Sequence, residues 1–333
     1  MAKVTVLGAG AWGSTMAQVL IDGGNEVLIW GRSAEVVLEI NTLHTNKKYL
    51  GAQVLPDSLQ ATSDIKVAFA HSKYVVLAIP AQNLREKLIE LKPLFTGDEI
   101  IISTLKGIEI STQLRMSEII EEILPNRKIA VITGPNLADE LILRQPAAAV
   151  IASQSVELAR ELQGIFKAQY FRVYTSTDVM GCELAGAVKN VIALAVGIAI
   201  GLGLGENTQA MIITRGLNEV ARLCAAHGSE PLTAAGLAGM GDLVATCGSP
   251  LSRNRSFGEA LGRGGSIEYA RQNFSRTVEG VSSASAVIEV AHRVGVEVPI
   301  IESVADLVKG LLTPQQAMDR LMKISTESEN FIK

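Results

Sequence analysis

The chain has 333 residues and a formal net charge of −4, with 48% hydrophobic and 19% charged residues. Its length suits about two domains of ~150 residues each, and its composition is that of a globular protein rather than a disordered one. The negative net charge argues against a general nucleic-acid surface and against a surface that binds anionic membranes.

The first half of the chain alternates short apolar runs, which predict strands, with amphipathic stretches, which predict helices. Helices are expected between the strands at positions that include 15–21, 84–91 and 112–123. The expected strands cover residues 4–7, 27–30, 75–79, 100–103, 129–133, 147–152 and 171–174. This βαβ alternation predicts an α/β fold in which residues 1–178 form a Rossmann-type, doubly wound, mostly parallel sheet that binds a dinucleotide.

After residue 178 the strand-like runs nearly vanish and long helical patterns follow. The expected helices cover residues 179–200, 208–226, 282–294, 301–311 and 315–323. We therefore expect residues 179–333 to form an all-helical domain that binds the substrate and carries the catalytic groups. The longest apolar run, 191–204, is shorter than the ~18–20 residues of a membrane span and is interrupted by glycines, so it predicts a buried helix and no membrane span.

Two further features of the composition concern location and metals. A strand-like run begins at once after Lys3, where a signal peptide would need a longer apolar segment. The three cysteines are far apart, as expected of reduced, buried thiols in a cytoplasmic protein, and the four histidines show no metal-ligand spacing. We therefore expect a cytoplasmic protein whose chemistry needs no metal.

The segment GAGAWG at residues 8–13 matches the dinucleotide-binding pattern G-x-G-x-x-G between a predicted strand and a predicted helix. In this pattern Gly8 permits the tight turn, Gly10 lets the backbone approach a pyrophosphate, and Gly13 lets the helix pack close to the strand. The helix N-terminus then offers N–H donors to the phosphates. The alternative is a turn that is merely rich in glycine.

The residues after the second predicted strand bear on cofactor choice. A site selective for NAD often has an acidic residue here, which binds the ribose 2′-hydroxyl. This chain has Arg32 and Ser33 instead, which suit a 2′-phosphate. NADP(H) is therefore favoured and NAD(H) is the alternative cofactor, unless Arg32 is an ordinary surface arginine.

The helical half contains two groups of candidate catalytic residues. Lys189 lies in the otherwise apolar segment 186–192, where it either snorkels to the surface or exchanges a proton with a substrate. Asp242 lies on a glycine-flanked turn, and Ser252-Arg253-Asn254 opens a predicted helix. Such a helix start with a guanidinium and a hydroxyl suits an anion, although a simple N-cap with solvated arginines has the same pattern.

Several motifs in order across both halves resemble the bacterial-type NAD(P)-dependent glycerol-3-phosphate dehydrogenases along nearly the whole chain. The matching stretches are GAGAWG at 8–13, NTLHTNKKYL at 41–50, STLKGIE at 103–109, GPNLADE at 134–140, ELAGAVKNVIA at 183–193, LSRNR at 251–255 and VEG at 278–280. The resemblance implies interconversion of dihydroxyacetone phosphate and sn-glycerol 3-phosphate by hydride transfer with NAD(P)H. This reaction would supply glycerol 3-phosphate for phospholipid synthesis, and a homodimer is one assembly that the resemblance allows.

The resemblance also implies roles for individual residues. Lys189 would exchange the proton at the substrate oxygen, Asp242 would bind the hydroxyl end of the substrate and orient Lys189, and Lys106 would touch both substrate and nicotinamide. The substrate would further meet Gly134, Asn136, Ser252, Arg253 and Asn254, the last three around its phosphate. The dinucleotide would meet Gly8, Gly10, Ala11, Trp12, Gly13, Arg32, Ser33, Tyr49, Lys106, Ala138, Arg253 and Glu279.

The chain departs from the family pattern at a few positions, and two other functions compete. Asn136 stands where Ser or Thr is usual, Leu137 where Phe is common, and Ile200 where an acid is frequent. The alternative enzyme is a related dehydrogenase of a 3-hydroxy acid or a sugar acid, because such enzymes also use a helix lysine. A catalytically silent dinucleotide-binding regulator would keep segment 8–13 without needing Lys189, Asp242 and Arg253.

Overall fold

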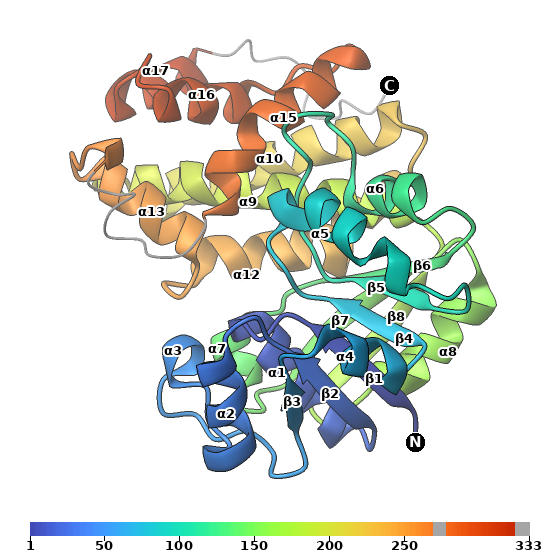
Figure 1. Ribbon diagram of the computed structural model, residues 1–333. Helices are drawn as coiled ribbons and strands as arrows, with labels where there is room; N and C mark the ends of the chain where they lie inside the picture. The colour runs from blue at the N-terminus through green and yellow to red at the C-terminus, as the bar shows by residue number, and fades with distance from the viewer. Residues whose placement is uncertain (269–277, 324–333) are drawn as a thin grey trace. The chain divides into compact units, whose positions relative to one another are not determined.

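The computed structural model describes residues 1–268 and 278–323, which form two compact units (Figure 1). Unit 1 contains Met1–Leu105 and Met116–Val179, and unit 2 contains Lys106–Arg115 and the chain from Met180 onward. The expectation of a single boundary at residue 178 therefore misses one segment, because Lys106–Arg115 packs with the helical unit. The end of the expected C-terminal domain, residues 324–333, lies outside the described residues.

Unit 1 contains an eight-stranded sheet with the strand order β3-β2-β1-β4-β5-β6-β7-β8. Neighbouring strands pair in parallel except β6 and β7, which are antiparallel. The strands are β1 (Lys3–Leu7), β2 (Glu26–Trp30), β3 (Gln60–Thr62), β4 (Tyr74–Leu77), β5 (Ile100–Ser103), β6 (Lys128–Thr133), β7 (Ala147–Ala152) and β8 (Phe171–Ser176). The predicted Rossmann-type, mostly parallel sheet is confirmed.

The direction of the chain through the sheet reverses at β1, which lies between β2 and β4. Ligands of doubly wound sheets bind at the carboxyl ends of the strands beside such a reversal. The glycine-rich segment 8–13 follows β1 directly, so the topology places it at this point. The fold thus provides a dinucleotide-binding position where the sequence pattern predicts one.

The helices of unit 1 agree in place with the amphipathic patterns, with two corrections: the helix expected from residue 15 begins earlier, at Ala11, and the one expected from residue 112 begins later. They are α1 (Ala11–Asp22), α2 (Ala34–Leu43), α3 (Lys47–Leu50), α4 (Ile65–His71), α5 (Leu84–Leu91), α6 (Met116–Ile123), α7 (Ala138–Leu141) and α8 (Val156–Phe166). The helix expected from residue 112 begins only at Met116, which is buried with Ile119, Ile120 and Ile123. Residues 112–115 belong instead to a hairpin-like turn in which Ile108 bridges Arg115.

From Met180 onward the described part of unit 2 is helical, as predicted. Its helices are α9 (Val179–Gly201), α10 (Glu206–Ala226), α11 (Pro231–Ala235), a π-helical turn (Leu237–Gly241), α12 (Asp242–Gly248), α13 (Arg253–Gly262), α15 (Glu279–Arg293), α16 (Pro299–Val308) and α17 (Pro314–Met322). By length and hydropathy alone α9 could cross a membrane, but 89% of its most apolar stretch is buried inside the structure. We therefore assign α9 as the core helix of unit 2.

Glycines let α9 and α13 touch backbone to backbone. A Cβ atom on Gly197 would lie 2.0 Å from the carbonyl oxygen of Arg255, and one on Gly258 would lie 2.2 Å from that of Leu194. Gly201 and Gly262 make the same kind of contact one turn further along. Only glycine, which lacks Cβ, permits such an approach, so these residues set the separation of the two helices.

We expect Gly258→Ala to destabilise the protein by about 1–3 kcal/mol, because the added methyl group must push α9 and α13 apart. The measurement is the thermal unfolding midpoint, followed by circular dichroism. Gly164→Ala is the matched control, since Gly164 also lies in a helix but its Cβ would meet nothing within 4 Å. If the two variants unfold at the same temperature, the helices are not held apart by this contact.

Candidate active site

The glycine-rich loop of unit 1 has the backbone that its sequence predicts. Gly8 has φ +125°, and a Cβ there would lie 2.4 Å from the carbonyl oxygen of Ala78. A Cβ on Gly13 would lie 1.8 Å from the carbonyl oxygen of Gly8, whereas one on Gly10 would meet nothing within 4 Å. The loop is therefore tightly packed at Gly8 and Gly13 and open at Gly10. Gly10 is the N-cap of α1 and has no side chain to cap the helix, so N–H groups of the first turn stay available to an anion.

Two side chains beside this loop bear on whether a dinucleotide fits. Asn46, which is fully buried, donates to the carbonyl oxygen of Ala9 (3.0 Å) and to the Ser14 hydroxyl (2.9 Å) and so holds the loop. The buried Trp12 Nε1 has no hydrogen-bond partner in the described structure. An open phosphate cradle and an unsatisfied indole donor both fit a bound dinucleotide.

The residues after β2 begin beside the glycine-rich loop. Gly31 packs against the loop, since a Cβ there would lie 2.9 Å from the Cβ of Ala9. Arg32 follows it and is exposed, with no ion pair to a described residue. Ser33 begins α2 as its N-cap and accepts from Val36 N (3.5 Å), so its oxygen already serves the helix.

The other unit 1 residues of the expected site lie at element ends. Tyr49 lies in α3, and the Lys48 ammonium is 5.5 Å from its ring centre. Ala138 is the first residue of α7, and Gly134 follows β6 with φ +134°. The amide nitrogen of Asn136, once its amide is oriented to match its neighbours, donates to the carbonyl oxygens of Ala148 (3.1 Å) and Pro135 (3.0 Å).

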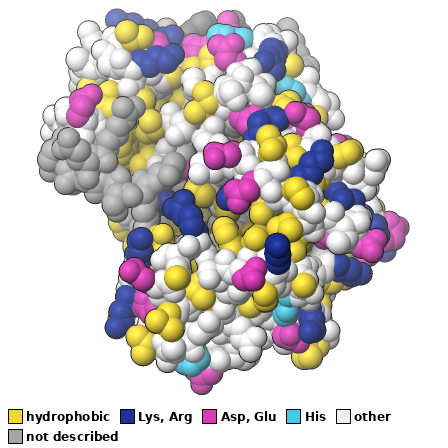
Figure 2. Space-filling model, in the orientation of Figure 1, with side chains coloured by type: hydrophobic (Ala, Val, Ile, Leu, Met, Phe, Trp, Pro, Cys, Tyr) yellow, Lys and Arg dark blue, Asp and Glu magenta, His cyan; other side chains and the backbone are white. Residues whose placement is uncertain are grey.

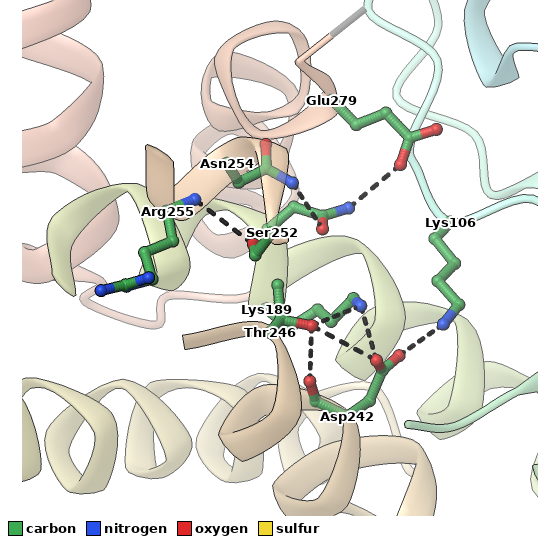
Figure 3. A network of polar contacts seen from close by, with 9 residues as sticks. Lys106, Lys189, Asp242, Thr246, Ser252, Asn254, Arg255 and Glu279 are labelled. Carbon is green, nitrogen blue, oxygen red and sulfur yellow. Dashed lines mark hydrogen bonds and ion pairs between the residues drawn. The ribbon is translucent and has the colours of Figure 1, made fainter. Parts of the chain in front are cut away.

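In unit 2, two lysines converge on one buried carboxylate (Figure 3). Lys189 from α9 donates to Asp242 Oδ1 (2.5 Å), and Lys106 donates to Asp242 Oδ2 (2.6 Å). Asp242 is 1% exposed and is the first residue of α12. Burial lowers the pKa of Lys106 to about 8, helped by the nearby charge of Lys189 and opposed by Asp242. The cluster carries one net positive charge when both lysines are protonated.

Thr246 completes this cluster and is not predicted from the sequence. Its hydroxyl accepts from the Lys189 ammonium (2.7 Å) and donates to the carbonyl oxygen of Asp242 (2.6 Å), one helical turn earlier in α12. Lys189 is therefore held by two partners rather than extended to solvent, and it is 7% exposed. The snorkelling alternative for Lys189 is thus wrong.

A second polar network lies beside the cluster and involves Asn254 (Figure 3). Asn254 Nδ2 donates to Asn190 Oδ1 (2.9 Å), and Asn254 Oδ1 accepts from Gly280 N (2.9 Å). Asn190 Nδ2 in turn donates to Glu279 Oε2 (3.2 Å). Burial raises the pKa of Glu279, and the positive charge of Arg253 is the largest opposing influence. Asn190, like Thr246, is not singled out by the sequence, although it directly follows Lys189.

The start of α13 has the chemistry of an anion-binding helix end. Ser252 is its N-cap and accepts from Arg255 N (3.3 Å), and Arg253 is the exposed first residue of the helix. Arg255 points away from the lysine cluster in Figure 3. The structure therefore brings Lys106, Lys189 and Asp242 into contact and places Ser252 and Arg253 at a helix N-terminus, while Gly134 and Asn136 belong to unit 1.

Such a cluster suits a reaction that builds negative charge on a substrate oxygen, because ammonium groups can both stabilise that charge and donate a proton. Among the described residues, no group of three or more His, Cys, Asp or Glu side chains could hold a metal ion. Cys182, Cys224 and Cys247 are all buried and form no disulfide, and burial raises the pKa of Cys247 to about 12. A buried thiol of this kind is a poor nucleophile.

Comparison with known proteins agrees with the site. The family profiles for the N-terminus and the C-terminus of NAD-dependent glycerol-3-phosphate dehydrogenase match residues 3–159 and 178–319. The glycerol-3-phosphate dehydrogenase (NAD(P)+) of Streptomyces griseus is 48% identical over 329 residues, covering 98% of each chain. That of Corynebacterium glutamicum is 52% identical over 308 residues, covering 91% of this chain and 92% of the relative.

Solved structures show the same relationship. Glycerol-3-phosphate dehydrogenase from Coxiella burnetii superposes with a TM-score of 0.92 at 35% identity, covering 97% of this chain and 99% of that one. A ketopantoate reductase from Ralstonia eutropha superposes with a TM-score of 0.61 at 17% identity, covering 95% and 99%, and so shares the fold alone. The chain belongs to the NAD-dependent glycerol-3-phosphate dehydrogenase family.

Proposed function

We propose that this chain interconverts dihydroxyacetone phosphate and sn-glycerol 3-phosphate with NAD(P)H. The observation that carries the proposal is the convergence of Lys189 and Lys106 on the buried Asp242 in a chain that also has the dinucleotide loop. The test is loss of reduced-nicotinamide absorbance with dihydroxyacetone phosphate, using NADPH and NADH separately. A 3-hydroxy acid assayed in the oxidative direction tests the alternative dehydrogenase, and turnover of it alone would overturn the proposal.

The proposed chemistry assigns a separate task to each residue of the cluster. Bound NAD(P)H supplies the hydride that reaches the carbonyl carbon of the substrate. Lys189 gives its proton to the carbonyl oxygen as negative charge develops there, and Lys106 adds positive charge beside it. Asp242 holds both ammonium groups in place and accepts from the substrate hydroxyl. In the reverse direction Lys189 accepts the proton again.

The start of α13 is the proposed site of the substrate phosphate. Arg253 supplies a guanidinium, Ser252 a hydroxyl proton, and the ten-residue helix the positive end of its dipole. Asn254 uses one amide proton on Asn190 and keeps a second that can reach a phosphate oxygen. Gly134 and Asn136 are also proposed as substrate-binding residues.

For the cofactor we propose NADP(H) in preference to NAD(H). Support comes from the residues after β2. Arg32 is exposed there, and the acidic residue that binds a ribose 2′-hydroxyl in NAD-selective sites is absent from this position. The residues proposed to contact the dinucleotide are Gly8, Gly10, Ala11, Trp12, Gly13, Arg32, Ser33, Tyr49, Lys106, Ala138, Arg253 and Glu279. The Ser33 oxygen caps α2 as an acceptor, which leaves its hydroxyl proton for a phosphate oxygen.

We expect Arg32→Ala to weaken use of NADPH by about 10- to 150-fold in kcat/KM, because a charge-assisted contact of ~1.5–3 kcal/mol is lost. Use of NADH should hardly change, since NADH has no 2′-phosphate. Steady-state kinetics with both cofactors make the measurement. Arg172→Ala is the matched control, because Arg172 is also an exposed arginine of unit 1. Equal losses with both cofactors would place the 2′-phosphate elsewhere.

The wider role follows from the product. We propose that the enzyme supplies glycerol 3-phosphate for phospholipid synthesis in the cytoplasm, with small molecules as its reaction partners. Basic and acidic side chains are interspersed on the face shown in Figure 2, which agrees with the expectation that no nucleic acid is bound. A homodimer stays a prediction, and size-exclusion chromatography with light scattering tests it.

A further inference from the structure

The segment Lys106–Arg115 is a hairpin that packs with unit 2, although the chain enters it from β5 and leaves it into α6, both in unit 1. Ile108 and Arg115 form an antiparallel bridge, and Glu109 N donates to the carbonyl oxygen of Leu114 (2.9 Å). The hairpin begins with Lys106, whose ammonium reaches Asp242. A displacement of the hairpin would therefore displace a group of the proposed active site.

Contacts beyond that of Lys106 also fix this hairpin to the rest of unit 2. Ile108 is 0% exposed and belongs to the helical core. Arg293 donates to the Gln113 side chain at the tip of the hairpin. At its far end Arg115 Nη1 donates to Glu183 Oε2 on α9 at 2.6 Å, and the side chains of Arg115 and Glu183 are 14% and 3% exposed. The last contact is an ion pair removed from solvent.

A buried ion pair is weak evidence for stability, because the cost of removing two charges from water offsets most of their attraction. An apolar pair of similar size would fill the same space at similar stability. An ion pair instead fixes the relative orientation of the two side chains, because a guanidinium and a carboxylate bind each other in few geometries. Glu183 lies on the same helix as Lys189, so the pair ties the hairpin that carries Lys106 to the helix that carries Lys189.

We propose that Arg115 and Glu183 are positioning residues for the reaction, which act by holding the Lys106 ammonium against Asp242. The bridge between Ile108 and Arg115 connects the two arms of the hairpin. Fixing Arg115 therefore also fixes Ile108, which lies two residues after Lys106. This role rests on the proposed function. It extends the active site to an ion pair that touches neither substrate nor cofactor.

The test is a double-mutant cycle between Glu183→Gln and Lys106→Ala. Glu183→Gln keeps the shape of the side chain and removes its charge. In the wild-type background we expect it to lower kcat/KM for dihydroxyacetone phosphate by about 10- to 100-fold, the loss typical of a misplaced reacting group. In the Lys106→Ala background the same change should cost at most about twofold, because the group that Glu183 positions is then absent, and this non-additivity is the sign of coupled residues.

An equal loss of kcat/KM in both backgrounds would mean that Glu183 has a general structural role. That result would overturn the positioning role and leave the proposed function standing. A wild-type chain inactive with dihydroxyacetone phosphate would overturn the proposed function and this role with it. Arg320→Met is the matched control, because it breaks the exposed Arg320–Asp306 pair (2.7 Å) of unit 2, and it should leave kcat/KM unchanged.

Glu183→Gln leaves the buried charge of Arg115 without the opposite charge of Glu183, so a second variant guards against a loss of activity that comes only from unfolding. Arg115→Met combined with Glu183→Leu removes both charges, and it should unfold near the wild-type temperature. The double variant should show the same loss of kcat/KM, again only when Lys106 is present. A folded double variant with wild-type kcat/KM would overturn the proposal.

Discussion

Replacing Lys189 with alanine should lower kcat for dihydroxyacetone phosphate reduction by at least about 10²-fold, the low end of general acid catalysis. Loss of charge stabilisation at the carbonyl oxygen adds to this effect. Binding of NADPH should be nearly unchanged. The variant should fold, because the buried Asp242 keeps its ion pair with Lys106 at 2.6 Å. Steady-state and single-turnover kinetics measure the loss, and fluorescence titration measures NADPH binding.

Two variants make this test specific. Lys189→Arg should not restore activity, since a guanidinium keeps its charge but cannot release a proton near neutral pH. Lys309→Ala, at an exposed lysine just after α16, should behave as wild type. A Lys189→Ala enzyme that retains more than about a tenth of kcat would contradict the assignment, provided that a deuterium isotope effect shows hydride transfer to be rate-limiting.

Arg253→Ala should lower kcat/KM for dihydroxyacetone phosphate by about 10- to 150-fold, because the charge-assisted contact with the phosphate is lost. Arg253 is exposed at the first position of α13, where a phosphate can reach both its guanidinium and the helix N–H groups. Unphosphorylated dihydroxyacetone should be a poor substrate of the wild type, and its kcat/KM should change much less in the variant.

The Arg253 experiment needs a control for the cofactor, because the same guanidinium is expected near the dinucleotide. The KM for NADPH is therefore measured in parallel. Arg263→Ala is the matched control, since Arg263 follows the other end of α13 and is 70% exposed, and it should leave both substrates unaffected. Equal losses with the phosphorylated and the unphosphorylated ketone would move the phosphate site away from α13.

The sequence predicts the fold well where hydrophobic periodicity is strong. Strands β5 and β7 and helix α5 have the expected bounds, and the remaining predicted strands differ by one or a few residues at their ends. The three-residue strand β3 is not predicted, because so short a run shows no periodicity. The helix start at Met116 is missed because residues 112–115 continue the amphipathic pattern although they form a hairpin-like turn in unit 2.

The residues of the proposed site also fall into those that the sequence indicates and those that it does not. Lys189 and Asp242 stand out because each is a charge in apolar or glycine-rich surroundings. Their partners do not stand out: Thr246 meets Lys189 across 57 positions of the chain, and Asn46 meets Ala9 across 37. Such polar residues acquire their role only when the chain folds. For the same reason the sequence does not show that Asn254 turns inward to Asn190 and Gly280.

The backbone contact between α9 and α13 has a consequence for substrate length. Lys189 lies on α9, and the proposed phosphate site lies at the start of α13, so the span between proton donor and phosphate is set by two main chains in contact. Rotamer changes in the core cannot stretch that span, because no side chain separates the helices at Gly197 and Gly258. The distance between the proton donor and the proposed phosphate site is thus fixed by the backbone. A redesign for a longer phosphorylated ketone would have to begin at these glycines rather than at the residues that touch the substrate.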